Sequence, residues 1–157
     1  MIVLGLDLSS VRSGWAIIKN GRFYNRLDID YGFISPPKKF SAGEKLTYLR
    51  EILIEVLSRN IIDIICLEDV FALRNVNTLK VLCEYRGIAR QVLYEELSIE
   101  PEIVPVKQIR TIFGTQDKEE LFKKVVSKFK IKDWDFKNYN DITDAIAAAY
   151  YLYKGKK

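Results

Sequence analysis

The chain has 157 residues, a formal net charge of +4 and no histidine. The length fits one domain over residues 1–157, and the lack of histidine removes the usual general base at neutral pH and the usual zinc ligand. Without an apolar stretch of spanning length, a signal peptide or a lipidation motif, we expect a soluble, cytoplasmic protein with no membrane attachment.

The predicted elements begin with an apolar strand over residues 2–7, followed by a hairpin. Its two strands are expected over residues 14–18 and 22–34, around the turn Lys19-Asn20-Gly21. Asn-Gly is a strong signal for a tight hairpin turn. The segment Ser35-Pro36-Pro37 then interrupts the pattern.

Helices and strands alternate in the rest of the chain. Apolar residues recur at helical spacing over residues 41–60, and a fourth strand follows at 61–67. Strands reached through helical crossovers pair in parallel. The predicted fold class is therefore α/β, a mixed five-stranded sheet with three antiparallel strands and then two parallel ones, flanked by helices. The remaining elements are expected at about Asn75–Leu97 (helix), Glu102–Pro105 (strand), 117–130 (helix) and 140–153 (helix).

Carboxylates stand at the ends of two predicted strands. Asp7 ends the first apolar run, and Glu68 ends the run from Ile61 to Leu67. An ionised carboxylate in such a place is costly to desolvate unless something pairs with it. If the first and fourth strands lie side by side in parallel, both acids meet at the edge where open α/β sheets usually bind ligands.

A second pair of acids, Asp141 and Asp144, lies near the C-terminus. Their i, i+3 spacing places them on one helical face, and the alanines around them would let that helix press against the sheet. Together the four acids form an all-oxygen ligand set, which suits magnesium or manganese better than zinc. Taken singly, Asp7 also fits a loop acid after a strand, and Asp141 or Asp144 fits a cap or a first-turn acid favoured by the helix dipole.

The predicted helix at about Asn75–Leu97 carries two apolar arcs, so one face would serve the core and the other would be left for a partner. A helix enclosed within the monomer fits the periodicity equally well. The first arc holds Leu79, Leu82, Cys83, Ala89, Leu93 and Leu97, and the second holds Val81, Tyr85, Ile88 and Val92.

Four sets of segments are informative in combination: Val3–Asp7 with Gly14–Ile18, Leu67–Asn75 with Arg86-Gly87, Val106–Gln108 with Gly114 and Lys118, and Asp141–Ala145. In this order they resemble segments of RuvC-type Holliday junction resolvases in the RNase H-like nuclease superfamily. Leu8-Ser9 departs from the proline-glycine that is common in the family. Asp141 corresponds to a position that is histidine in some relatives.

The resemblance implies a structure-selective endonuclease that resolves four-way DNA junctions by paired symmetric nicks. Two Mg²⁺ ions per active site, or Mn²⁺, would be held by the four acids. It also implies a homodimer through the helix at about Asn75–Leu97. Lys107 and Lys118 match basic residues of the family's catalytic or DNA-contacting surface. Phe71 is expected to stack on bases, and Arg74, Asn75 and Arg110 to contact DNA.

Alternatives stay open on the sequence alone. Phe71 also fits a lid on the core, Asn75 a helix cap, and each lysine an ordinary surface residue. Another RNase H-like nuclease would use the same acids on an RNA–DNA hybrid or on transposon ends. A non-catalytic nucleic-acid-binding member of the fold is disfavoured because all four acids are present. The sequence does not identify a helicase partner.

Overall fold

The computed structural model describes residues 1–20, 27–69 and 75–156. Within them no helix is long and apolar enough to cross a membrane. The elements in chain order are β1 (Ile2–Asp7), β2 (Ser13–Asn20), β3 (Leu27–Ile34), α1 (Ala42–Ser58), β4 (Ile64–Glu68), α2 (Val76–Leu97), β5 (Glu102–Val104), α3 (Val106–Thr111), α4 (Lys118–Phe129) and α5 (Phe136–Gly155).

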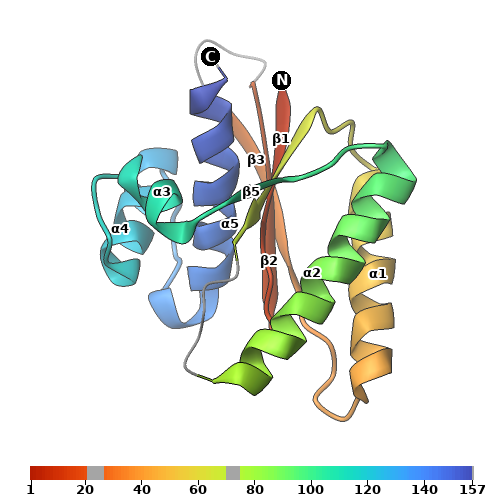
Figure 1. Ribbon diagram of the computed structural model, residues 1–157. Coiled ribbons are helices and arrows are strands. Elements are labelled where there is room, and N and C mark those ends of the chain that lie inside the picture. The colour runs from red at the N-terminus through yellow and green to blue at the C-terminus, as the bar shows by residue number, and fades with distance from the viewer. Residues whose placement is uncertain (21–26, 70–74, 157) are drawn as a thin grey trace.

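The strands form one five-stranded sheet in the order β3-β2-β1-β4-β5, shown in Figure 1. β1 and β3 run antiparallel to β2, whereas β4 runs parallel to both β1 and β5. This arrangement confirms the predicted mixed sheet. Leu6 pairs with Leu67 in the β1–β4 register, so the next residues, Asp7 and Glu68, end two neighbouring strands at the same edge.

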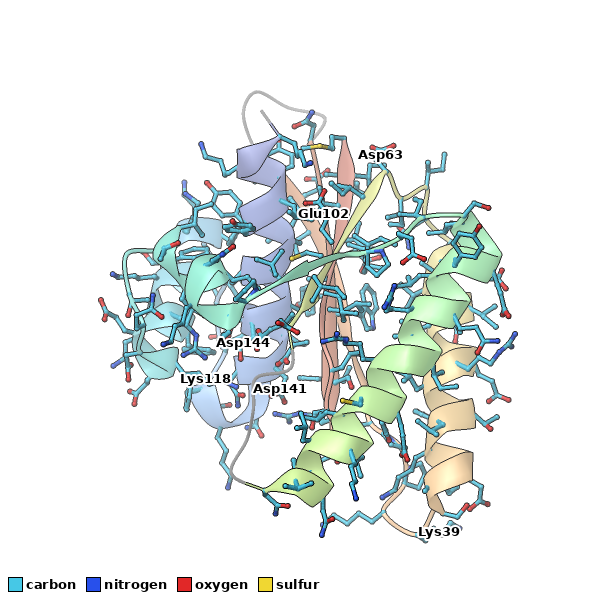
Figure 2. The ribbon with its side chains drawn as sticks, in the orientation of Figure 1. Lys39, Asp63, Glu102, Lys118, Asp141 and Asp144 are labelled. Carbon is cyan, nitrogen blue, oxygen red and sulfur yellow. The ribbon has the colours of Figure 1, made fainter. Side chains whose placement is uncertain are left out.

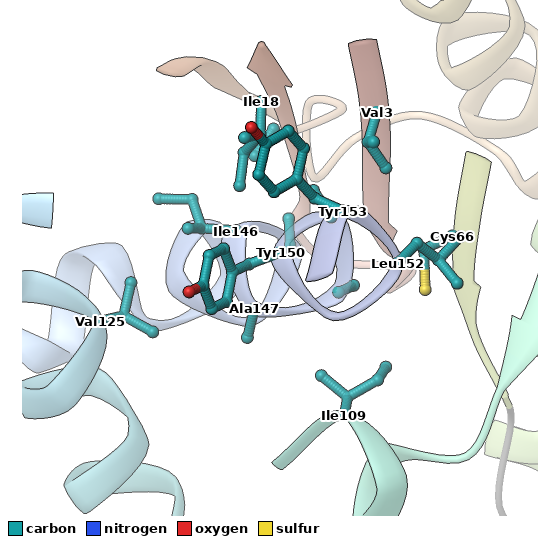
Figure 3. Close-up of a cluster of buried hydrophobic side chains, with 14 of the residues drawn as sticks. Val3, Ile18, Cys66, Ile109, Val125, Ile146, Ala147, Tyr150, Leu152 and Tyr153 are labelled. Atoms are coloured by element: carbon teal, nitrogen blue, oxygen red, sulfur yellow. The ribbon is translucent and has the colours of Figure 1, made fainter. Parts of the chain in front are cut away.

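Helices cover both faces of the sheet, with α1 and α2 on one side and α3, α4 and α5 on the other (Figure 1). Side chains alternate across a strand, and β1 accordingly sends Leu4 and Leu6 to the α1–α2 core and Val3 to the α5 core. Figure 3 shows the α5 core, where Val3 and Cys66 from the sheet meet the buried side of α5.

The alanine-rich face of α5 lies unusually close to the sheet. A Cβ atom on Gly5 of β1 would stand 2.1 Å from the carbonyl oxygen of Ala145, and one on Gly14 of β2 would stand 2.2 Å from that of Asp141. Both strands need glycine where the helix crosses them, because any larger residue would meet backbone. This contact brings the first half of α5, with its two aspartates, to the ends of β1 and β4.

Some predicted boundaries were wrong. Lys19 and Asn20 pair with Asp28 and Leu27, so they extend β2 and do not form the expected tight turn; residues 21–26 lie outside the described part of the chain. The fourth strand begins at Ile64, since Ile61 is exposed. α5 begins at Phe136, before the expected residue 140, because the Asp135 side chain caps it. The short helix α3 was not predicted, because it is too short to show a helical period.

Candidate active site

The four predicted acids come from three elements that meet at one edge of the sheet. Asp7 and Glu68 end β1 and β4, while Asp141 and Asp144 lie on α5 well inside the helix. Figure 2 shows Asp141 and Asp144 along the first half of α5, with Lys118 beside them. Asp135 is the N-cap of α5, so the alternative interpretation of Asp141 or Asp144 as a cap or first-turn acid is wrong.

Three of these carboxylates share one electrostatic environment. Burial raises the pKa of Asp7 well above its ordinary value, and repulsion from Glu68, Asp144 and Asp141 adds to the effect. Burial and then Asp144 raise the pKa of Glu68 to about 7. The pKa of Asp144 is also raised, mainly by burial. Acids that hinder one another's ionisation in this way are a common feature of functional sites.

Lys118, at the start of α4, supplies positive charge to this cluster. Its Nζ atom lies 2.7 Å from Oδ2 of Asp144, which is almost fully buried. Burial lowers the pKa of Lys118, but Asp144, Asp7 and Asp141 together outweigh it, so the net shift is upward. The structure therefore places this predicted lysine in direct contact with a predicted metal ligand.

Arg12, which the sequence did not single out, makes the equivalent contact with the other aspartate of α5. Its Nε atom donates to Oδ2 of Asp141 at 2.6 Å, and a terminal nitrogen donates to the carbonyl of Lys137 at 3.3 Å. The guanidinium also lies 4.6 Å from the centre of the Phe33 ring. Each aspartate of α5 is thus paired with a cation of the same chain.

Arg110 of α3 belongs to the same environment, since its charge lowers the pKa of both Glu68 and Asp144. One terminal nitrogen donates to the carbonyl of Gln116 at 2.8 Å, while its Nε atom is buried without a hydrogen-bond partner in the structure. Lys107 lies exposed on the same short helix. Of these two basic residues, Arg110 therefore lies close enough to the acids to act on their charge.

The remaining DNA-contact candidates are less defined by the structure. Asn75 is the N-cap of α2, and its Oδ1 atom accepts from the backbone of Asn77 and Thr78 at 3.0 and 3.2 Å. The capping interpretation of Asn75 is therefore confirmed, and its DNA contact stays a prediction. Phe71 and Arg74 lie outside the described residues.

The donor chemistry at this edge fits a hard divalent cation, because all of the donors are carboxylate oxygens. Burial disfavours the ionisation of Asp7, Glu68 and Asp144 without a counter-charge. Among the described residues, no three histidine, cysteine or acidic side chains are grouped closely enough to hold an ion as they stand. At Asp141 and Asp144 the counter-charge comes from Arg12 and Lys118.

Neither cysteine contributes to the site. Cys66 is buried in β4, and burial raises the pKa of its thiol to about 12, which is typical of an unreactive buried thiol. Cys83 is exposed on α2, and both cysteines are free thiols.

The mixed five-stranded sheet with helices on both faces is the fold of solved RuvC structures. The model of the family described as crossover junction endodeoxyribonuclease RuvC matches residues 3–151. The chain belongs to this RuvC family.

Named relatives cover nearly the full length of the chain. The crossover junction endodeoxyribonuclease RuvC of Dictyoglomus thermophilum is 28% identical, with 98% of each chain covered. That of Caldicellulosiruptor saccharolyticus is 31% identical over 95% of this chain and 90% of its own. Among solved structures, T. thermophilus RuvC in complex with a Holliday junction substrate has a TM-score of 0.83 at 16% identity, with 99% of this chain and 95% of that chain covered.

Proposed function

We propose that this chain is a single-domain, divalent-metal-dependent endonuclease that resolves four-way DNA junctions by paired symmetric nicks. The observation that carries the proposal is that Asp7, Glu68 and Asp144 are buried together at the edge where two parallel strands end. Burial, and then repulsion among these acids, raises the pKa of Asp7 and of Glu68. Family membership supports the substrate, since the relatives are named crossover junction endodeoxyribonucleases.

The four acids would hold two Mg²⁺ ions, with Mn²⁺ as a substitute. When bound, such ions supply a nucleophilic water at neutral pH and neutralise charge on the reacting phosphate. Asp7 and Glu68 provide donors from the rigid sheet, and Asp141 and Asp144 provide them from a helix held by its contact with Gly5 and Gly14. Because Arg12 and Lys118 lie on the two helix acids, metal binding there requires an exchange of cations.

Three basic residues would bind the DNA phosphate. Lys118, once released from Asp144, has an ammonium group beside the acids that can neutralise charge on the scissile phosphate. Arg110 has a buried Nε donor without a hydrogen-bond partner in the structure, and its charge lowers the pKa of both Glu68 and Asp144. Lys107 lies on the exposed side of the same short helix and would contact the backbone farther out.

The proposed enzyme acts as a homodimer through α2. The two arcs predicted on this helix were divided wrongly, because the core side takes Tyr85 and Val92 from one and Ala89 and Leu93 from the other. The opposite side presents an exposed stripe of Val76, Cys83, Gly87 and Tyr94, of which Val76 is 59% and Tyr94 56% exposed.

Gly87 strengthens the case for a second helix packed on this stripe. A glycine within a helix costs about 1 kcal/mol relative to alanine, and a Cβ atom at Gly87 would meet none of the described residues within 4 Å. Close approach by another backbone would explain its presence. Because Cys83 is exposed on the same stripe and Cys66 is buried, mild oxidation should cross-link two copies through Cys83 if α2 packs on α2. A Cys83→Ser variant is the matched control, and cross-linking that persists in it would contradict this interface.

Asp7→Asn tests the nuclease assignment directly. It removes one charge from the acid cluster with little change in shape, so nicking of a synthetic four-way junction should be lost while junction binding in a gel-shift assay is kept. An Asp7→Asn variant that nicks the junction like the wild type would show that Asp7 is not a catalytic residue. Tight binding by the wild type without any nicking, in Mg²⁺ and in Mn²⁺, would favour a non-catalytic protein instead.

A further inference from the structure

We propose that Arg86 is a positioning residue for the active site, through which α2 holds the end of β4 and its acid, Glu68. The inference rests on the proposed function, because it assigns Glu68 to metal binding. It adds a role for α2 within the subunit, besides its proposed contact with a second copy.

The contact runs through Asp69, the residue directly after Glu68. The backbone N–H of Asp69 donates to the carbonyl of Val104 at 2.9 Å, which continues the β4–β5 pairing one residue past the strand. The Asp69 carboxylate accepts a hydrogen bond from a terminal nitrogen of Arg86 at 2.6 Å. Both side chains are partly shielded from solvent, so this ion pair fixes the end of β4 more firmly than a fully exposed pair would.

The preceding residue of α2, Tyr85, contacts the segment that follows β1, the strand that ends at Asp7. Tyr85 is buried, and its hydroxyl lies 3.5 Å from the carbonyl oxygen of Ser10, in the segment that follows Asp7. The ends of both acid-bearing strands therefore contact one helix at consecutive positions. A displacement of α2 would move Asp69, beside Glu68, and Ser10, in the segment after Asp7, at the same time.

Gly87, the next residue, lies on the exposed stripe assigned to the dimer contact. Three consecutive residues of α2 thus make three different contacts. Tyr85 contacts the segment after Asp7, Arg86 contacts the residue after Glu68, and Gly87 lies on the exposed stripe. Pairing of two copies through α2 would restrain both acid-bearing strand ends. This arrangement makes metal binding dependent on the placement of α2.

The sign of the effect separates positioning from a simple charge effect. Arg86 is a cation near a cation site, so its charge alone opposes metal binding, and its removal would strengthen binding. If Arg86 acts by holding Asp69 and Glu68 in place, its removal weakens binding. Mutation of residues that orient metal ligands typically costs about 10–100-fold in metal affinity.

The test is Mn²⁺ binding to the full chain without DNA, measured by electron paramagnetic resonance. Arg86→Gln should weaken Mn²⁺ binding by about tenfold. The metal concentration for half-maximal nicking should rise by a similar factor, with the rate at saturating metal nearly unchanged. Arg86→Lys should recover part of the affinity, and the exchanged pair Asp69→Arg with Arg86→Asp should recover more than either single change.

Arg50→Gln is the matched control. Arg50 makes a comparable ion pair, 3.2 Å from Glu95, between α1 and α2 but away from both acid-bearing strand ends. It should leave Mn²⁺ binding unchanged, and urea unfolding should show that each variant is folded under the assay conditions.

Unchanged or tighter Mn²⁺ binding by Arg86→Gln would overturn the inference while leaving the proposed function intact. An equal loss in Arg50→Gln would also overturn it, since loosening α2 in general would then suffice. If Arg86→Gln does not fold, Arg86→Met, which also removes the charged contact with Asp69, decides by the same criterion. A wild-type protein that neither binds Mn²⁺ nor nicks a junction would defeat the proposed function itself.

Discussion

Lys118 and Asp144 form an ion pair, with Nζ 2.7 Å from Oδ2, inside the acid cluster assigned to metal binding. The lysine occupies one of the oxygens that a metal ion would use. The same side chain compensates the buried aspartate in the metal-free protein and, under the proposed function, would be displaced by a bound metal ion.

This exchange predicts that Lys118→Met binds metal more tightly although it loses activity. The variant has no ammonium to displace from Asp144, so Mn²⁺ affinity should rise by roughly tenfold, or about 1.4 kcal/mol. Nicking should fall sharply because the phosphate loses its counter-charge. Calorimetric titration measures the Mn²⁺ affinity. The control is Lys123→Met, since Lys123 lies on the same helix but pairs with Glu119. It should change neither the Mn²⁺ affinity nor the nicking rate. Weaker metal binding by Lys118→Met would show that the lysine supports the metal site.

Asp7→Asn should stabilise the metal-free protein while it abolishes nicking. Burial and three neighbouring acids disfavour the Asp7 charge, so its removal should raise the free energy of unfolding at pH 8 by about 1–2 kcal/mol. Urea unfolding in chelator measures this gain. With saturating Mg²⁺ the order should reverse, because only the wild type gains the full stabilisation from bound metal. A less stable Asp7→Asn in chelator would contradict the predicted repulsion.

The pKa of Glu68 predicts how stability depends on pH. Its ordinary value of 4.5 is raised to about 7 in the folded protein, so between these values the folded state holds a proton that the unfolded chain has released. Stability without metal should therefore fall as pH rises through this window.

Glu68→Gln should remove the Glu68 share of this dependence. The loss of unfolding free energy between pH 5 and pH 8 should be smaller in the variant, by up to about 3 kcal/mol. Urea unfolding at the two pH values, in chelator, gives the comparison. If the wild type and Glu68→Gln lost the same unfolding free energy between pH 5 and pH 8, the predicted rise in the pKa of Glu68 would be wrong.

Gly5→Ala should disrupt both the fold and the site. The added methyl would stand 2.1 Å from the carbonyl oxygen of Ala145 and force α5 away from β1, at a cost of about 3 kcal/mol or more. Gly43→Ala is the control, because a Cβ atom there meets nothing within 4 Å. Thermal unfolding distinguishes the two, and a Gly5→Ala protein as stable as Gly43→Ala would show that the helix–sheet contact is loose.

Phe71→Ala tests the residue expected to stack on opened bases. It should impair junction nicking and opening while it leaves Mn²⁺ affinity unchanged, with a loss of about 1–3 kcal/mol in DNA stacking. Fluorescence of 2-aminopurine near the crossover reports opening. Equal processing by the variant and the wild type would return Phe71 to a role in the core.

Much of the site was predictable because its acids follow from local patterns. Apolar runs marked the strands that end at Asp7 and Glu68, and the i, i+3 spacing placed Asp141 and Asp144 on one helical face. The parallel pairing of β1 with β4 then followed from the helical crossover between them.

The arginines that pair with acids in and beside the site were harder to find. Arg12 and Asp141 are separated by 129 positions, and Arg86 and Asp69 by 17. A lone arginine in a loop or on a helix has no period, so only the tertiary placement of α5 and α2 reveals its partner. The exposed stripe of α2 was misjudged for a related reason, because neighbouring arcs of a helix do not show where the core ends.

Strand-resolved cleavage of a synthetic four-way junction decides whether this protein is a junction-resolving nuclease. The same assay should include a linear duplex and an RNA–DNA hybrid, each with Mg²⁺, with Mn²⁺ and with chelator. A junction-resolving nuclease should give paired, symmetric nicks that are confined to the junction and absent in chelator. Cleavage of the hybrid with an intact junction would contradict this function and identify a different RNase H-like nuclease.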